Sequence, residues 1–253
     1  MTYVTQWLGG LGLAFSLVMP SYAEENKAPV TLTPEQTTQL AKINAILNGH
    51  PQIIEDLSKS LEAYVTQQKQ VEAALKEQRD WLTQAPEHSK SGADNPALTI
   101  INFTDYNCPY CKRLEIGLAK LLTEMDNVRI VNIYVPLQQQ IASGTNTNSA
   151  FYALKVWEKA PEKFAEVHRL LVAHPTRHDA ESLNRIAKET GTEKYLETGE
   201  REQSIVSRNM QAFRQLGLRG TPALIMNDEI IPGFLPYSEL KEAVQKELNS
   251  NKI

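Results

Sequence analysis

The sequence predicts an α/β fold, and three features of the chain lead to that prediction. A short apolar run, Leu98–Phe103, is followed by Cys-Pro-Tyr-Cys at 108–111 and a helix-like apolar pattern, and a second apolar run spans Val128–Val135. This strand, helix, strand order is typical of a βαβ unit with a cysteine pair at the N-terminus of its helix. A long helical pattern precedes the unit, and a block with helical character, residues 145–217, follows it.

The composition limits the class of protein. The 253 residues contain 26 Lys and Arg against 30 Asp and Glu, so the formal net charge is −4. Because there is no positive surplus to neutralise phosphates, we expect no nucleic-acid partner. A hydrophobic content of 42% is enough for an ordinary core. Two cysteines are too few for a four-cysteine zinc site or for a domain held by many disulfides.

Residues 1–23 are predicted to be a cleavable signal peptide. They contain no charged side chain, and the apolar stretch Trp7–Met19 is shorter than the roughly 20 residues of a membrane-spanning helix. Ser21 and Ala23 are the small residues that a signal peptidase requires at its cleavage point. The absence of Lys and Arg before the apolar stretch is atypical, and a buried or interfacial N-terminal helix is the alternative. Cleavage after Ala23 would release an exported protein.

Residues 24–91 are predicted to form an N-terminal helical oligomerisation region. A spacing of three and four residues runs along a mostly apolar stripe formed by Ile54, Leu57, Leu61, Tyr64, Gln68, Val71, Leu75, Gln78 and Leu82. Such a repeat is typical of a helix that buries a narrow stripe against a partner helix. The alternative is that this helix packs on its own globular domain. A shorter pattern from Leu40 to Leu47 predicts a preceding helix that ends near Gly49 and Pro51.

Residues 85–97 contain two prolines and a glycine among small or polar side chains, so they are interpreted as a linker. The globular domain is predicted at 92–253, with a helical insertion at about 140–217. Within the insertion, Asp179 is a candidate helix N-cap, and Gly191 is expected to end the same helix.

Strand character returns after the insertion. Two short strands are predicted at Ala223–Met226 and Glu229–Ile231, separated by the turn residues Asn227 and Asp228. A final helix at about Tyr237–Leu248 closes the predicted domain.

The cysteine pair carries the predicted chemistry. In disulfide exchange the thiolate is the nucleophile, and a helix N-terminus favours negative charge through its unpaired N–H groups and its dipole. Cys108, at the start of the helix, is therefore the candidate nucleophile. Cys111, one turn into the helix, is expected to be buried and protonated, and to resolve a mixed disulfide by attacking Cys108. Pro109 is tolerated in the first turn, where its missing N–H costs little.

Other interpretations of the pair are weaker. A zinc site would need further ligands, but there is no second cysteine pair and the five histidines show no finger-like spacing. A purely structural disulfide would close too small a loop to stabilise the fold much. Cu(I) could bind the reduced pair without other ligands, so copper binding stays open. We therefore expect no metal site and no cofactor beyond a redox-active Cys108–Cys111 disulfide.

Over residues 95–248 the chain resembles the DsbA-like thioredoxin-fold disulfide oxidoreductases of bacterial envelopes. The resemblance is carried by the helical insertion and by the segments Phe103-Thr-Asp-Tyr-Asn-Cys108-Pro-Tyr-Cys111 and Gly217-Leu-Arg-Gly220-Thr221-Pro222-Ala223. It implies a thioredoxin fold with an inserted helical domain, preceded by an N-terminal α-helical oligomerisation region.

The resemblance also implies a substrate site. The proline that matches Pro222 is cis in the family and faces the cysteine pair, and the residue before it, here Thr221, presents its backbone to the substrate peptide. A rigid bond between a glycine-containing turn and a strand fits that position. Pro109 and Tyr110, between the cysteines, are expected to contact substrate together with Thr221 and Pro222.

Cys-Pro-Tyr-Cys with threonine before the proline resembles the isomerase and reductase branches, or the copper-sensitivity suppressor ScsC, more than the strongly oxidising DsbA type. The resemblance implies a periplasmic oxidoreductase or isomerase that acts on cysteine-containing exported proteins. It further implies a DsbB- or DsbD-like membrane redox partner and a homo-oligomer, with a dimer favoured over a trimer. The alternatives are an envelope copper-handling or chaperone-like protein that uses the same cysteine pair, and a structural surface protein that merely inherited the fold.

The chain departs from the family pattern at one position. Many relatives carry a buried glutamate six residues before the first cysteine, where it is thought to help proton transfer at the buried thiol, and this chain has Asn102 there. Asp105 is expected to point elsewhere on the strand-to-helix turn. Proton transfer is therefore expected to use water or Lys112, with no carboxylate base.

Overall fold

The computed structural model describes residues 31–250, so the predicted signal peptide lies outside the described residues. Two units are distinguished along the chain, and the division falls between Ser58 and Lys59.

The described part of the first unit is helical. Helix α1, Pro34–Gly49, is followed by the short 3₁₀ helix η1, Pro51–Ile53, and by the first residues of α2, Ile54–Gln84. Thr33 caps α1 through a reciprocal side-chain and backbone pair with Gln36, and Pro34 lies in the first turn, where its missing N–H costs nothing. The predicted helix that ends near Gly49 is therefore confirmed.

The apolar side chains of this unit are exposed. Leu40, Ile43, Ile46 and Ile54 are each about half exposed, with Ile46 at 55%. None of the side chains of α1 is buried by any residue that the structure describes. The apolar side chains of α1, and Ile54 at the start of the stripe that predicts self-association, thus stay uncovered in the described chain.

The second unit holds a five-stranded sheet with the strand order β1-β3-β2-β4-β5. Its strands are β1 Ser89–Gly92, β2 Leu98–Thr104, β3 Val128–Tyr134, β4 Ala223–Met226 and β5 Glu229–Pro232. Its helices after α2 are α3 Pro109–Glu124, α4 Ser149–Lys159, α5 Pro161–Ala173, α6 Ala180–Thr190, the 3₁₀ helix η2 Glu193–Tyr195, α7 Glu200–Gln215 and α8 Tyr237–Ser250. Strands β2 and β3 pair in parallel and the other pairs are antiparallel, which confirms the predicted βαβ unit β2–α3–β3.

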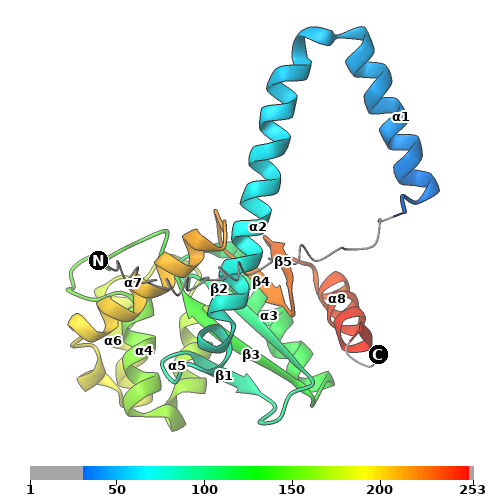
Figure 1. Cartoon of the computed structure of the whole chain (residues 1–253). Helices are drawn as coiled ribbons and strands as arrows, with labels where there is room; N and C mark the ends of the chain where they lie inside the picture. Colours follow the sequence, from blue (N-terminus) through cyan, green and yellow to red (C-terminus); the bar gives the residue numbers. More distant parts are fainter. Residues whose placement is uncertain (1–30, 251–253) are drawn as a thin grey trace, which may run out of the picture. The chain divides into compact units, whose positions relative to one another are not determined.

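Helices cover both faces of the sheet (Figure 1). Alternate residues of a strand point to opposite faces, so Ile100 of β2 packs against α3 and α8, whereas Ile101 packs against α2 and α7. The resulting α/β fold is thioredoxin-like, with the helices α4–α7 inserted between β3 and β4. The predicted fold class is confirmed for this unit.

The inserted helices build a core of their own. Asp179 caps α6 through a hydrogen bond from the Ser182 N–H to its side chain, and Gly191 ends the helix with a left-handed φ of 61°, as predicted. The hydrophobic core of the inserted helices also contains Tyr106 and Tyr134, whose rings stack with centroids 5.1 Å apart. These two residues join the inserted helices to the sheet. The insertion is therefore anchored beside the turn that leads into α3.

The second half of α2 packs on the sheet. Leu75 and Leu82 are buried in the cluster that also contains Ile101, Phe103 and Phe213. For this part of the predicted stripe, the alternative interpretation is correct, since the helix buries its apolar face on its own domain. Leu61 and Tyr64, nearer the start of the helix, remain 55% and 59% exposed.

The prediction of a linker at 85–97 is wrong. Residues 89–92 form the edge strand β1, antiparallel to β3, and the Ser89 hydroxyl is hydrogen-bonded to the Tyr134 hydroxyl at 2.8 Å. Gly92 has a φ of 97°, and a Cβ there would lie 2.3 Å from the carbonyl oxygen of Val128. The second unit begins at Lys59 within α2, and the sequence analysis places a domain boundary between residues 91 and 92. In the part of the chain that the structure describes, no helix combines the length and the apolar character needed to cross a membrane.

Candidate active site

The turn between β2 and α3 presents the cysteine pair. Cys108 is the N-cap residue of α3 and has an extended backbone, and Pro109 occupies the first helical position. The Cys108 N–H donates to the carbonyl of Asp105 at 2.9 Å, and the Cys108 carbonyl accepts from the Lys112 N–H at 3.1 Å. Both cysteines are buried free thiols, with Cys108 4% and Cys111 1% exposed.

The loop before β4 lies against the first cysteine. The Thr221–Pro222 peptide bond is cis, as the resemblance implies. The Cys108 Sγ–H donates to the Thr221 carbonyl at 3.3 Å. Of the six predicted site residues, Cys108, Cys111, Thr221 and Pro222 therefore come together, although the chain separates the two pairs by more than a hundred positions.

The two thiols ionise very differently. A hydrogen bond from the Cys111 side chain lowers the pKa of Cys108 to about 6, and backbone N–H groups in the first turn of α3 act in the same direction. Burial raises the pKa of Cys111 far above its ordinary value, and its hydrogen bond to Cys108 adds to that rise. At neutral pH Cys108 is mostly a thiolate, whereas Cys111 keeps its proton.

Tyr110 lies at the exposed end of the helix. Its side chain is 56% exposed, and its ring centroid is 6.3 Å from that of Phe234, in the segment between β5 and α8. The guanidinium carbon of Arg113 lies 4.8 Å from the Phe234 ring centroid and 5.8 Å from that of Tyr110. The sequence analysis did not identify Phe234, because nothing in its spacing links it to the cysteines.

Polar side chains fix the turn that carries Cys108. One Asp105 oxygen accepts from the Asn107 N–H and the other from the Gln138 N–H, both at 2.8 Å, and burial raises the pKa of this carboxyl group. The Asn107 side-chain oxygen accepts from the His178 N–H at 2.9 Å, in the inserted region. Asp105 thus fastens the turn to the segment after β3, and Asn107 fastens it to the inserted region.

Lys112 is held by the inserted region as well. Its Nζ donates to the carbonyls of His174 and Thr176, and burial lowers its pKa. Through these two bonds, Lys112 positions α3 against the loop after α5. The structure gives no support to its expected use as a proton donor at the thiols.

Helix α3 also carries a buried carboxylate, which the sequence analysis did not identify. Glu115 is 7% exposed and follows Cys111 by four positions, so both occupy the same side of the helix. One Glu115 oxygen accepts from the Asn102 amide at 2.8 Å, and the other lies 3.4 Å from Nε2 of His168. The ring nitrogen Nδ1 of His168 is 2.7 Å from the hydroxyl of Tyr106. Glu115 thus lies beside Asn102, the residue that stands where many relatives carry a glutamate, but its oxygens face Asn102 and His168. The expectation of proton transfer without a carboxylate base stays a prediction.

The side chains described around the two thiols do not form a metal site with three or more ligands. Among residues 31–250, no three His, Cys, Asp or Glu side chains converge as metal ligands. A soft cation at this site would thus depend on the two sulfur atoms of Cys108 and Cys111.

Comparisons with known proteins agree with this geometry. The family model described as thioredoxin matches residues 83–246. Disulfide bond formation protein D of Bacillus subtilis is 26% identical over 170 residues, which cover 62% of this chain and 75% of that protein.

Solved structures extend the likeness to the N-terminal helices. A linker-deletion mutant of Proteus mirabilis ScsC is 26% identical, with a TM-score of 0.68, and the match covers 88% of this chain and 100% of that one. A periplasmic thioredoxin-like protein from Salmonella enterica serovar Typhimurium is 31% identical, with a TM-score of 0.62, over 68% of this chain and 95% of that one. With the family matched over more than half of its length and the cysteine pair at the start of α3, the chain belongs to the thioredoxin family, as a DsbA-like thiol-disulfide oxidoreductase.

Proposed function

We propose that the protein is a periplasmic oxidoreductase and isomerase that forms or reshuffles disulfides in exported proteins. The observation that carries the proposal is the placement of two thiols one helical turn apart at the start of α3, with opposite pKa shifts and the Thr221 carbonyl 3.3 Å from Cys108 Sγ. A thiolate at the start of a helix is the nucleophile that the first step of exchange requires.

The exchange proceeds in two steps. The Cys108 thiolate attacks one sulfur of a client disulfide, so that the client S–S bond breaks, a mixed disulfide forms, and the second client sulfur leaves as a thiolate. Cys111 then loses its proton and attacks Cys108 Sγ, which releases the first client sulfur and leaves a Cys108–Cys111 disulfide. The client gains two electrons and the protein loses two.

Isomerisation uses the first step alone. A different client thiolate attacks the mixed disulfide, a new client S–S bond forms, and Cys108 leaves as a thiolate. The low pKa of Cys108 favours this outcome, because a more acidic thiol is a better leaving group. Oxidation of a client dithiol is the reverse of the two-step sequence and starts from the Cys108–Cys111 disulfide.

The substrate site in this proposal consists of Pro109, Tyr110, Thr221 and Pro222 around Cys108. The cis bond before Pro222 and the 56% exposure of Tyr110 support it. Electrons would pass between the cysteine pair and a DsbB- or DsbD-like membrane protein. Export through a signal peptide at 1–23 is part of the same proposal, and the periplasmic relative from Salmonella supports it.

We further propose that the mature protein is a homo-oligomer. The exposed apolar side chains at the start of α2, including Leu61 and Tyr64, support this arrangement. A Leu61→Glu variant is expected to sediment as a smaller species than the wild type, while a matched Gln70→Glu variant keeps the wild-type size. A wild type that sediments as a monomer at micromolar concentration would contradict the oligomer.

Refolding of a scrambled multi-disulfide protein tests the proposed function. In a mildly reducing buffer, mature protein that begins at Glu24 should restore native pairing, and Cys111→Ser should be limited to isomerisation through Cys108. Rapid oxidation of a reduced client without recovery of scrambled pairing would assign the protein to the oxidases. If neither reaction occurs while Cu(I) binds in a one-to-one ratio, the copper-handling alternative replaces the enzyme.

A further inference from the structure

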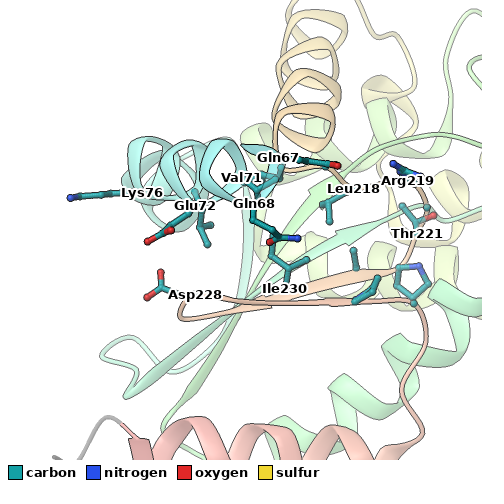
Figure 2. A pocket seen from close by; sticks show the side chains of 18 of the residues that line it. Gln67, Gln68, Val71, Glu72, Lys76, Leu218, Arg219, Thr221, Asp228 and Ile230 are labelled. Atoms are coloured by element: carbon teal, nitrogen blue, oxygen red, sulfur yellow. The ribbon is translucent and has the colours of Figure 1, made fainter. Parts of the chain in front are cut away.

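A groove of about 1050 Å³ runs beside the candidate active site, within the second unit. Its residues come from α2, from the loop before β4 and from the β4–β5 hairpin (Figure 2). The volume is at the upper end of the range of pockets that hold whole small-molecule ligands, so the groove has room for several residues of an extended chain.

One end of the groove lies at the reactive sulfur. Thr221 and Pro222 line it, and the Thr221 carbonyl accepts the Cys108 Sγ–H at 3.3 Å. A Cβ placed on Gly220 or Gly233 would meet no described atom within 4 Å, so this end is open. A polypeptide joined to Cys108 therefore starts at the mouth of the groove.

The other end of the groove is marked by an ion pair. Arg79 of α2 donates to Asp228, at the tip of the β4–β5 hairpin. Asp228, Ile230 and Pro232 alternate along the hairpin, so they point to the same face and form one wall. The groove thus follows the length of β5, starting from the loop before β4.

Helix α2 forms the opposite wall. Gln67 and Gln68 provide amide groups, and Val71 provides an aliphatic surface across from Ile230 (Figure 2). A Cβ on Gly217, whose φ is 69°, would lie 3.3 Å from Cγ2 of Val71, so the helix packs directly on the loop before β4. This contact fixes the separation of the two walls without any ligand.

We infer that this groove holds an extended segment of the client polypeptide beside the cysteine that is joined to Cys108. The inference rests on the proposed function and assigns a binding surface to it. Side-chain amides can pair with the backbone of any sequence, and Val71 with Ile230 offers contact to the apolar side chains that a misfolded client exposes. The groove therefore suits non-native polypeptides in general and not one particular sequence.

A pair of matched variants tests the groove. Gln68→Trp would narrow it, whereas Gln70→Trp places the same side chain two positions away, at an exposed residue that does not line it. Exchange is measured with oxidised glutathione, which is too small to reach along the groove, and with a mixed disulfide of glutathione and an extended peptide that carries apolar residues on both sides of its cysteine.

Gln68→Trp should lower kcat/KM for the peptide about tenfold and leave the glutathione rate unchanged. Gln70→Trp should change neither. Equal rates for the peptide in both variants, or an equal loss for both substrates in Gln68→Trp, would overturn the inference that the groove holds the client, while the proposed function stands. If the wild type exchanges with neither substrate, the proposed function fails and the groove fails with it.

Crosslinking gives an independent readout. In Cys111→Ser, the peptide stays joined to Cys108, and a photoreactive side chain placed several residues from its cysteine should attach to 67–79 or to 228–232. Attachment confined to the Tyr110 and Phe234 side, or to a second copy of the chain, would place the client elsewhere and overturn the inference.

Discussion

Cys108 and Cys111 are identical side chains one helical turn apart at the start of α3, and they lie in opposite environments. At Cys108, a hydrogen bond from the Cys111 side chain and backbone N–H groups lower the pKa to about 6. Cys111 lies within the core, as does Glu115 one turn further along, and burial raises the pKa of the Cys111 thiol. The comparison teaches that a few residues of displacement along one helix are enough to separate a nucleophile from a proton-holding thiol.

The largest expected effect separates the roles of the two cysteines. Cys108→Ser should reduce exchange with any disulfide by more than about 10³-fold, because the remaining thiol is buried and protonated. Cys111→Ser should still form a mixed disulfide and accumulate it, which mass spectrometry of the acid-quenched protein can detect. A Cys108→Ser protein that forms a mixed disulfide through Cys111 would contradict the different roles of the two cysteines.

A second prediction concerns the buried acid in the second turn. Glu115→Ala removes one of the two acceptors of the Asn102 amide, leaving Asn132 Oδ1, and should lower the free energy of unfolding by about 1–3 kcal/mol, as measured by denaturant unfolding of the reduced protein. Glu115→Gln keeps an acceptor and should lose less. Equal losses in the two variants would mean that the hydrogen bond contributes nothing, and no loss in either would mean that the carboxylate is not part of the core.

The reduced protein should also gain stability with pH relative to Cys108→Ser. The Cys108 pKa lies below that of an unfolded thiol, about 8.5, so between about pH 6 and 8.5 the unfolded state binds more protons. The stabilisation is therefore complete above the unfolded value and is lost as the pH falls through about 6. If the free energies of unfolding of the two proteins changed equally with pH across this interval, the start of α3 would not stabilise the thiolate.

The smallest expected effect is at the surface of the first turn. Tyr110→Ala removes a half-exposed ring that lies near Phe234 and Arg113, and should lower the rate of client exchange a few-fold with little change in stability. Steady-state kinetics with the same peptide disulfide would measure it. A large loss of exchange with oxidised glutathione as well would instead give Tyr110 a part in setting the reactivity of Cys108.

The sequence predicted the fold around the cysteines well, because each element has a local cause. Leu98–Phe103 and Val128–Val135 are short apolar runs, and the cysteine pair precedes a helical pattern, so β2, α3 and β3 follow directly. Strand β1 escaped prediction because Ser-Lys-Ser-Gly at 89–92 has no apolar alternation, and its pairing with β3 depends on the buried contact of Ser89 with Tyr134.

Helix α2 illustrates a different limit. One spacing of three and four residues runs along it, yet Leu75 and Leu82 are buried on the sheet whereas Leu61 and Tyr64 are exposed. Periodicity shows that a helix has an apolar stripe, but it does not say what covers the stripe. The covering surface here comes from Phe213 and Ile101, which are distant in sequence.

The candidate site was predictable only where a motif or the family resemblance marked it. Cys108 and Cys111 follow from their spacing, and Thr221 with Pro222 from the resemblance. Glu115 gave no such signal, since a glutamate in a helix is ordinarily exposed, and its burial depends on Asn102 and His168 from two other elements.

The central claim is that Cys108 is an ionised nucleophile at neutral pH, and its alkylation rate measured against pH tests that claim most directly. With the reduced protein and peptide mapping by mass spectrometry, the rate at Cys108 should rise through an apparent pKa of about 6 and level off below pH 8, while Cys111 reacts slowly throughout. A rate that keeps rising to an apparent pKa near 8.5, the value of an ordinary thiol, would contradict the account.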